Sequence, residues 1–297
     1  MNGKREYGDY QTPTDFAAIV CRFLCDKKHI KPSVVLEPTC GVGSFLKESL
    51  IFDAKKYYGI EINPEYCTIC KNEINDERVE IINADFFKYD FGPLEKDNLL
   101  IIGNPPWVNN STLSILDSDN LPEKTNFKGL KGIDALTGAS NFDICEYIIL
   151  QLLSEYRDTN TTIAMLCKTS VARNIFKELK RRDISFLYCD MIEFDATKVF
   201  SINASACLLL IQLTDKPVFP ENCNVYSFSD TEKLKSTFGY HNGQFYSDLS
   251  ADIADFDGIG VLNPKNVVIA ILILYKIPRF CCKRMCKIAH FPRISCI

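Results

Sequence analysis

The sequence predicts an α/β fold built on a doubly wound, parallel sheet of seven strands. Short apolar runs alternate with helix patterns along the first 213 residues, and turns rich in Gly, Asn and Pro separate them. This alternation indicates parallel strands joined by crossover helices. The strands are expected at residues 33–37, 57–61, 79–83, 98–103, 161–167, 184–194 and 204–213, and the helices at 44–52, 64–75, 142–156 and 171–182.

The composition and the lengths of the apolar runs indicate what class of protein this is. A hydrophobic content of 46% with 24% charged residues is typical of a soluble globular protein. The N-terminus does not resemble a signal peptide, and the longest apolar run, residues 267–275, is shorter than the roughly 20 residues that cross a membrane. We therefore expect a cytoplasmic protein. Its 14 cysteines are expected to be free thiols, because the N-terminus does not resemble a secretion signal. A metal site is not expected, because the Cys67–Cys70 CxxC lacks a second pair at zinc-ribbon spacing.

The turn after the first expected strand has the composition of a ligand-binding loop. Residues 37–43 read Glu-Pro-Thr-Cys-Gly-Val-Gly, and the glycines allow a close approach of the backbone to a ligand. Ligands bind beyond the carboxyl ends of strands in open parallel sheets. Because the loop lacks the Lys of a P-loop and Glu37 would repel a phosphate, a cationic ligand such as a sulfonium-bearing amino acid is favoured. A purely structural turn is the alternative.

Acidic residues follow the next two strands. Glu61 ends the second strand, where a carboxylate can accept both hydroxyls of a ribose. Asp85 follows the third strand and could accept from an adenine amino group, with Phe86 as an apolar wall. Each acid alone is equally consistent with an ordinary surface residue.

The fourth strand ends in the most specific motif, Asn104-Pro105-Pro106-Trp107. Two prolines stiffen the chain and remove two backbone donors. The side-chain oxygen of Asn104 and the carbonyl of Pro105 could then accept both hydrogens of an aromatic amino group, which frees the nitrogen lone pair for in-line attack on a methyl sulfonium. Trp107, the only tryptophan of the chain, could stack on an extruded base.

Together these motifs resemble the amino-methyltransferases of DNA restriction–modification systems, in the adenine-specific branch. Residues 104–107 match the catalytic tetrapeptide of that family, residues 37–45 its methyl-donor loop, and residues 7–13 a segment that closes over the methionine moiety in one subclass. The resemblance implies a Rossmann-like class I methyltransferase fold, with S-adenosyl-L-methionine as cofactor and double-stranded DNA as substrate. It also allows a cognate restriction endonuclease as a partner.

The resemblance assigns roles to individual residues. The catalytic residues would be Asn104, Pro105, Pro106 and Trp107, and the flipped base would be held by Trp107 and Phe200. The residues implied for the cofactor are Tyr10, Thr12, Pro13, Glu37, Thr39, Gly41, Gly43, Glu61, Ile62, Asp85, Phe86 and Phe142.

Four segments are expected along the chain. Residues 1–32 would close over the donor, residues 33–213 would form the catalytic domain, and the polar, irregular residues 214–264 would be a partial or truncated DNA-recognition region. Residues 265–297 hold seven basic residues, no acidic residue and four cysteines. We interpret this tail as non-native, the result of truncation or a frame shift; a DNA-contacting tail is the alternative.

Several functions remain open at this point. Methylation of adenine N6 in DNA is the leading interpretation. The N4 amine of cytosine needs the same two acceptors, and protein glutamine or an RNA base could also be the target. A donor-binding remnant without activity is the non-enzymatic alternative. A basic helix could contact phosphates or form a solvated face, with Lys168, Arg173, Lys177, Lys180, Arg181 and Arg182 as its basic residues.

Overall fold

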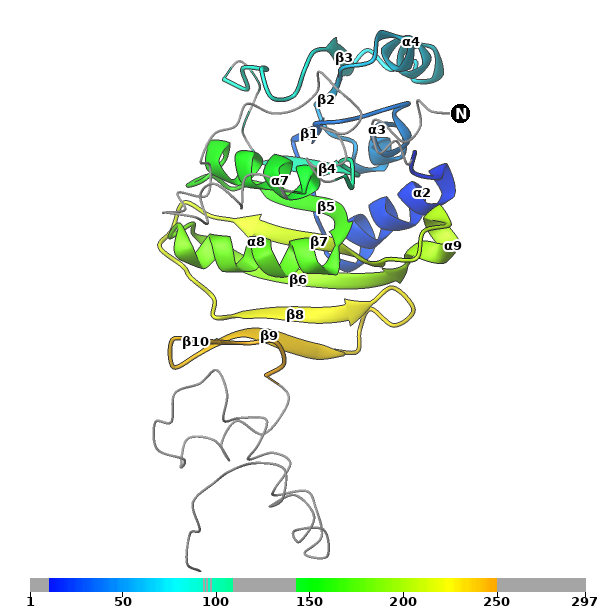
Figure 1. Cartoon of the computed structure of the whole chain (residues 1–297). Coiled ribbons are helices and arrows are strands. Elements are labelled where there is room, and N and C mark those ends of the chain that lie inside the picture. Colours follow the sequence, from blue (N-terminus) through cyan, green and yellow to red (C-terminus); the bar gives the residue numbers. More distant parts are fainter. Residues whose placement is uncertain (1–10, 93, 95, 97, 109–142, 250–297) are drawn as a thin grey trace, which may run out of the picture. The chain divides into compact units, whose positions relative to one another are not determined.

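A ten-stranded sheet forms the centre of the structure (Figure 1). The computed structural model describes residues 11–92, 94, 96, 98–108 and 143–249. The strands are β1 (Val34–Glu37), β2 (Lys56–Glu61), β3 (Val79–Asn83), β4 (Leu99–Gly103), β5 (Thr162–Lys168), β6 (Phe186–Asp195), β7 (Ser205–Leu213), β8 (Asn222–Ser227), β9 (Ser236–His241) and β10 (Gln244–Tyr246). Their order in the sheet is β10-β9-β8-β6-β7-β5-β4-β1-β2-β3.

The seven strands predicted from the sequence are confirmed, and so is the α/β, doubly wound fold class. Strands β3, β2, β1, β4 and β5 pair in parallel, whereas β7 runs antiparallel to both β5 and β6. All residues of the central strands β1 and β4 are buried. Such continuous apolar runs are typical of strands that are covered on both faces.

Three strands lie beyond the predicted seven. β8 pairs in parallel with β6, and β9 and β10 follow as antiparallel neighbours. The prediction of an irregular segment is therefore wrong for residues 222–246. The signal was short, since in β8 only Cys223 and Val225 alternate as buried residues with Asn224 between them. Whether residues 214–264 contribute to DNA recognition stays a prediction, and residues 265–297 lie outside the described residues.

Helices cover the sheet and position its loops. They are α2 (Thr14–Arg22), η1 (Phe23–Lys27), α3 (Ser44–Glu48), η2 (Ser49–Phe52), α4 (Pro64–Glu73), α7 (Ile144–Glu155), α8 (Thr169–Arg181) and α9 (Ala196–Phe200). Helices α7 and α8 pack on each other, and α8 packs on β5, β6 and β7 (Figure 1). In the described parts of the chain, no helix combines the length and the apolar character that a membrane span needs.

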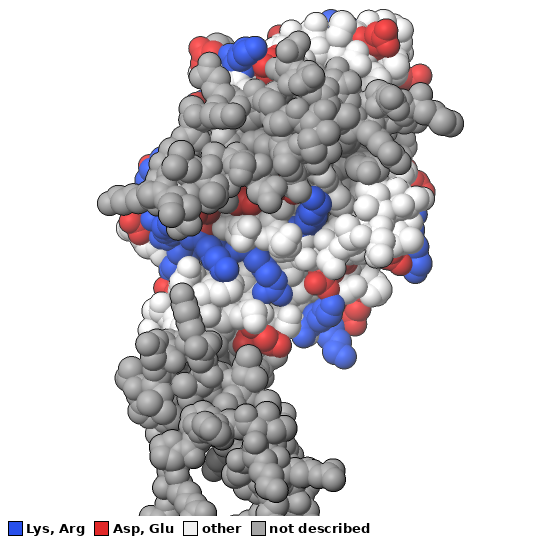
Figure 2. Space-filling view, in the orientation of Figure 1, with Lys and Arg blue, Asp and Glu red and all other residues white. Residues whose placement is uncertain are grey.

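The basic face of α8 supports the added strands. Figure 2 shows Lys and Arg side chains gathered over this helix. The guanidinium of Arg173 lies 4.3 Å from the ring centre of Phe238, and the Lys177 ammonium lies 4.3 Å from that of Phe245. Lys180 pairs with Glu221 at 2.6 Å. These cations therefore hold the β8–β10 extension against the helix, a role that the sequence pattern did not indicate.

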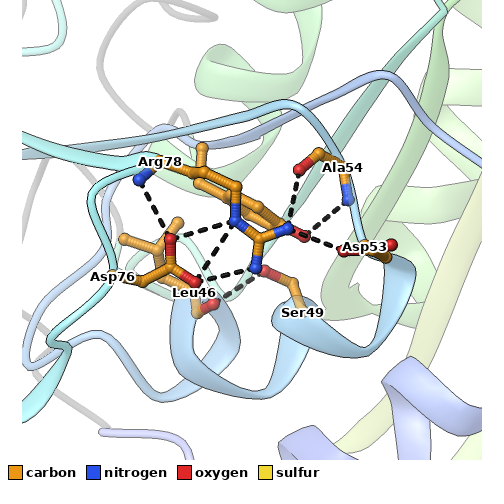
Figure 3. A network of polar contacts seen from close by, with 7 residues as sticks. Leu46, Ser49, Asp53, Ala54, Asp76 and Arg78 are labelled. Atoms are coloured by element: carbon orange, nitrogen blue, oxygen red, sulfur yellow. Dashed lines mark hydrogen bonds and ion pairs between the residues drawn. The ribbon is translucent and has the colours of Figure 1, made fainter.

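A charged network joins the turns that precede β2 and β3 (Figure 3). The Arg78 guanidinium donates to both carboxylate oxygens of Asp76, with the shortest bond at 2.7 Å, and to Asp53 at 2.7 Å. It also donates to the carbonyl of Ala54 and lies over the Tyr57 ring. Because these residues precede the strands, the network lies at the sheet edge opposite the strands' carboxyl ends.

Replacement of Arg78 tests this network. Arg78→Lys should lower the unfolding midpoint at neutral pH, because an ammonium cannot form the two-pronged bond to Asp76. The hydrogen bonds from Arg78 lower the pKa of Asp76 from 3.8 to about 2. The contribution of the Asp76 carboxylate is therefore present above its ordinary pKa and is lost as the pH falls toward about 2.

Thermal midpoints measured across the acid range check this expectation. The difference between wild type and Arg78→Lys should shrink as the pH falls. Arg157→Lys is the matched control, since Arg157 pairs with the neighbouring Asp158 on the surface. Equal effects of the two substitutions, or a difference that does not depend on pH, would contradict a stabilising role for the Arg78 network.

Candidate functional site

The loop after β1 has a backbone that glycine makes possible. Gly41 and Gly43 have φ values of +53° and +82°, in the left-handed region. A Cβ atom at Gly43 would overlap the Sγ atom of Cys70 on α4, and one at Gly41 would lie 2.6 Å from the side-chain oxygen of Gln11. The loop is thus enclosed between α4 and the residues that lead into α2.

The N-terminal residues contact this loop directly. The backbone N–H of Val42 donates to the Gln11 side-chain oxygen at 3.2 Å. Thr12 is buried, and Pro13 precedes the first turn of α2, where its carbonyl accepts from Ala17 at 3.0 Å. The described start of the chain therefore lies against the loop, as the resemblance implies for a donor-closing segment. Tyr10 lies outside the described residues.

Glu61 ties the end of β2 to the same loop. Its Oε2 accepts from the backbone N–H of Gly41 at 2.8 Å, and its Oε1 accepts from that of Asn63 at 2.7 Å. The Asn83 side chain donates to the carbonyls of Glu61 and Ile62 from the end of β3. The two bonds from Gly41 and Asn63 fix the direction of the Glu61 carboxylate. Ile62 follows with 42% of its surface exposed, next to the glycine loop.

Asp85 and Phe86 stand beyond the end of β3. Asp85 Oδ1 accepts from the backbone N–H of Phe87 at 3.0 Å, and its other oxygen lies 3.4 Å from the Lys88 ammonium. The Phe86 ring is buried and lies 5.4 Å from that of Phe91. The backbone bond orients the Asp85 carboxylate, while Phe86 belongs to the hydrophobic core.

Glu37 is a buried acid between the loop and β4. Only 3% of its surface is exposed, and its Oε2 accepts from the backbone N–H of Leu46 at 2.9 Å. A Cβ atom at Gly103, the last residue of β4, would lie 3.4 Å from Glu37 Cγ. Burial raises the pKa of the Glu37 carboxyl well above its ordinary value. This acid therefore connects the loop to the residue before the tetrapeptide.

The tetrapeptide occupies the carboxyl end of β4. The Oδ1 atom of Asn104 is shielded from solvent, and Pro105 and Trp107 are buried while Pro106 is half-buried. The indole N–H of Trp107 donates to the carbonyl of Leu166 in β5 at 3.3 Å. The prolines and this bond keep the segment close to β5.

Phe200, at the end of α9, contacts Trp107 of the tetrapeptide. Its ring centre lies 5.5 Å from that of Trp107, with the two planes at 72°. The structure thus brings together the two aromatic residues that the resemblance assigns to the base, although they are 93 positions apart. Phe142 lies outside the described residues, and Asp143 directly after it caps α7 by accepting from the backbone N–H of Cys145 at 3.0 Å.

A family comparison adds to this geometry. The family model described as N-6 DNA Methylase matches residues 1–213. The chain belongs to this family. Its members depend on S-adenosylmethionine, which confirms the cofactor predicted from the motifs at the level of the family.

Two curated relatives of this N-6 DNA methylase chain are named as a methyltransferase and a modification methylase. The Type II methyltransferase M.NspV of Nostoc sp. (strain ATCC 29411 / PCC 7524) is 40% identical over 259 residues, which cover 84% of this chain and 53% of the relative. The modification methylase CviBIII of Paramecium bursaria Chlorella virus NC1A is 25% identical over 234 residues, which cover 73% and 56%. The chain spans about half the length of these relatives.

Solved structures show the same fold. A class I S-adenosylmethionine-dependent methyltransferase described as putative, from Listeria monocytogenes, has a TM-score of 0.52 at 14% identity and covers 76% of this chain and 68% of its own. The EcoKI M protein of a Type I restriction enzyme has a TM-score of 0.51 at 12% identity and covers 74% and 48%. At these identities the likeness concerns the fold alone.

The described residues fit S-adenosylmethionine. Thr39 Oγ1 is buried in the glycine loop and makes no hydrogen bond to the part of the chain that the structure describes. A buried hydroxyl in this situation is suited to a ligand's polar group. Next to it, the Glu61 carboxylate is oriented by the two backbone bonds described above, and Ile62 provides exposed apolar surface. A nucleoside therefore has polar and apolar partners at this edge.

The thiols and acids near the site show no metal centre. The ten cysteines of the described segments are free thiols, including Cys67 and Cys70 of the CxxC. No group of three or more His, Cys, Asp or Glu suited to a metal ion occurs among the described residues. In this part of the chain Cys70 instead fills the space beside Gly43.

The buried Glu37 makes the stability of the protein depend on pH. Its pKa is raised by burial, so the folded chain holds this proton more tightly than the unfolded chain. The free energy of unfolding therefore falls as the pH rises through the ordinary carboxyl range up to the raised value. Glu37→Gln removes the titrating group while its side-chain oxygen can still accept from Leu46.

We expect Glu37→Gln to become more stable relative to wild type as the pH increases. Urea unfolding at about pH 5 and about pH 8 measures the change in this difference. Glu65→Gln, at the exposed start of α4, is the control. A difference between wild type and Glu37→Gln that stays constant, or that reverses with rising pH, would show that Glu37 is not buried as a neutral acid.

Proposed function

We propose that this chain transfers a methyl group from S-adenosylmethionine to the exocyclic N6 amine of adenine in DNA. The observation that carries the proposal is the position of the tetrapeptide. Residues 104–107 follow β4, which lies between β1 and β5 in the sheet, and a Cβ atom at Gly103 would lie 3.4 Å from Cγ of Glu37, the residue that ends β1 and begins the glycine loop. The acceptors for an amine and the loop for a methyl donor are therefore neighbours.

In this proposal the chain's own residues bind and orient both reactants. Glu61 would hold the ribose, Thr39, Gly41 and Gly43 would face the methionine part, and Asp85 would accept from the adenine amino group of the donor. The cofactor supplies a methyl group on a positively charged sulfur. The buried Glu37 favours positive charge nearby once it is ionised.

Asn104 and Pro105 would act on the target amine. Their two oxygens can accept both amine hydrogens, so that the nitrogen becomes tetrahedral and its lone pair points out of the ring plane. Because both acceptors belong to a stiff segment, little reorganisation is needed when positive charge develops on the nitrogen. Trp107 would stack on the flipped base, with Phe200 edge-on to the indole at 5.5 Å.

Incubation with labelled donor and unmethylated genomic DNA, followed by nucleoside analysis, tests the activity. We expect label in N6-methyladenine. Label in N4-methylcytosine would instead support the sister reaction, which uses the same acceptors. Absence of labelled nucleosides would refute DNA methylation by this chain.

The names of the curated relatives support a role in restriction–modification, with site-specific adenine methylation and a cognate endonuclease as partner. Residues 214–264 are proposed to take part in recognition of the DNA site. Both proposals rest on the proposed activity. Site-specific methylation is tested by whether DNA treated with the protein resists cleavage by endonucleases of known sequence specificity.

Asn104→Ala tests the catalytic step. Methyl transfer should be nearly abolished while the dissociation constant of the donor changes by no more than several-fold, because the amide acts at the accepting amine. Single-turnover rates and calorimetric donor binding measure the two effects. An equal loss of donor affinity would place Asn104 in the donor site instead.

Trp107→Ala tests the stacking role. The variant should lose about 1–3 kcal/mol of binding free energy for the target DNA, the usual contribution of one stacked base. Trp107→Phe is the matched control, because it keeps an aromatic face beside Phe200 while it loses the bond to Leu166 and one ring of the indole. DNA affinity that is unchanged in Trp107→Ala at fixed salt would exclude Trp107 as the base platform.

A further inference from the structure

Lys168 lies where three elements of the site meet. It is the last residue of β5, the strand that pairs with β4 up to the contact of Gly103 with Met165. Its ammonium lies 2.9 Å from Asp143 Oδ2 and 3.4 Å from the carbonyl oxygen of Trp107. One cation thus contacts the last residue of the tetrapeptide and the residue that begins α7.

Both oxygens of Asp143 are used at this junction. Oδ2 accepts from Lys168, whereas Oδ1 caps α7 through the backbone N–H of Cys145. The backbone joins the same two elements, because the N–H of Ile144 donates to the carbonyl of Val108 at 2.9 Å. Val108 and Ile144 therefore lie side by side next to the tetrapeptide.

Trp107 is held at two points by one strand. Its indole N–H is bonded to the carbonyl of Leu166, and its main-chain carbonyl is bonded to the ammonium of Lys168 two residues later. The first bond fixes the ring and the second fixes the backbone that carries it. The Lys168 and Asp143 side chains are 30% and 12% exposed, so solvent screens this pair only partly.

We propose that Lys168 is a positioning residue for the methyl-transfer step. It holds the tetrapeptide against β5 and α7, so that the distance and orientation between the ring of Trp107 and the oxygens of Asn104 and Pro105 stay fixed. This inference rests on the proposed function. Because Lys168 acts through Trp107 and Asp143, its loss should affect transfer to DNA and leave donor binding intact.

Trp107 offers a readout that does not depend on activity. It is the only tryptophan of the chain, so emission that is excited at wavelengths beyond tyrosine absorption reports on this ring alone. In Lys168→Met, which keeps the length of the side chain and removes its charge, the emission should shift to the red and acrylamide quenching should increase. Lys168→Arg retains a cation that can reach both acceptors and should restore most of the wild-type signal.

Single-turnover transfer to unmethylated genomic DNA gives the functional readout. Lys168→Met should be slower by about tenfold to a hundredfold, the range expected when reacting groups are displaced by up to an ångström. The donor dissociation constant should stay within about twofold of wild type, since a displaced acceptor does not change donor contacts. Asp143→Asn, whose side-chain oxygen can still cap α7, should show the same direction of change.

Lys28→Met is the matched control. The pair of Lys28 with Asp190 of β6 has a similar length, 2.6 Å, and similar burial, with exposures of 24% and 6%. Its loss should lower the unfolding midpoint without a change in Trp107 emission or in the transfer rate per folded molecule. An effect of this variant on emission equal to that of Lys168→Met would overturn the inference.

The remaining outcomes separate this inference from the proposed function. An active wild type whose rate is unaffected by Lys168→Met would overturn only the positioning role, whether or not the emission shifts. An inactive wild type would refute the proposed function and, with it, this role. A loss of donor affinity in Lys168→Met as large as the loss of rate would show that Lys168 supports the whole fold of the site.

Discussion

The parallel pairing of β1, β4 and β5 is the constraint on which the site depends. Ile101 of β4 pairs with Leu36 on one side and with Ile163 on the other, so the three strands end at the same edge. The backbone hydrogen bonds hold the strands together, and the packing of their buried side chains together with the connecting turns specifies the register. The glycine loop and the tetrapeptide follow two of these strand ends and Lys168 is the last residue of the third, so the pairing brings all three to one edge of the sheet.

Two acidic side chains, Glu61 and Glu37, then connect the loops at this edge of the sheet through hydrogen bonds. Glu61 bonds to the backbone of Gly41, and Glu37 bonds to the backbone of Leu46 while it packs beside Gly103. Acids that accept from backbone N–H groups are oriented by the chain itself, and their direction does not depend on flexible partners. Burial of Glu37 costs stability as an ion, which is consistent with a place for it next to a cationic ligand.

The sequence was informative wherever local patterns determine structure. Runs of apolar residues gave the seven strands, and Asn63-Pro64 gave the start of α4, where the Asn63 side chain accepts from Glu65. The contact of Lys168 with Trp107 was missed because 61 residues separate them and no local pattern connects them. The β8–β10 strands were missed since their alternation is short and their support comes from α8.

The bonding of Trp107 also limits what this residue can recognise. Its only side-chain hydrogen-bond donor is directed to the carbonyl of Leu166, so a base would meet the ring as an apolar face. Stacking is tolerant of sequence because every base has such a face. Discrimination between adenine and cytosine therefore cannot lie in Trp107. In the proposed reaction the oxygens of Asn104 and Pro105 would fit the amino group of either base, so the choice would come from the size and the hydrogen-bonding groups of the space around the ring.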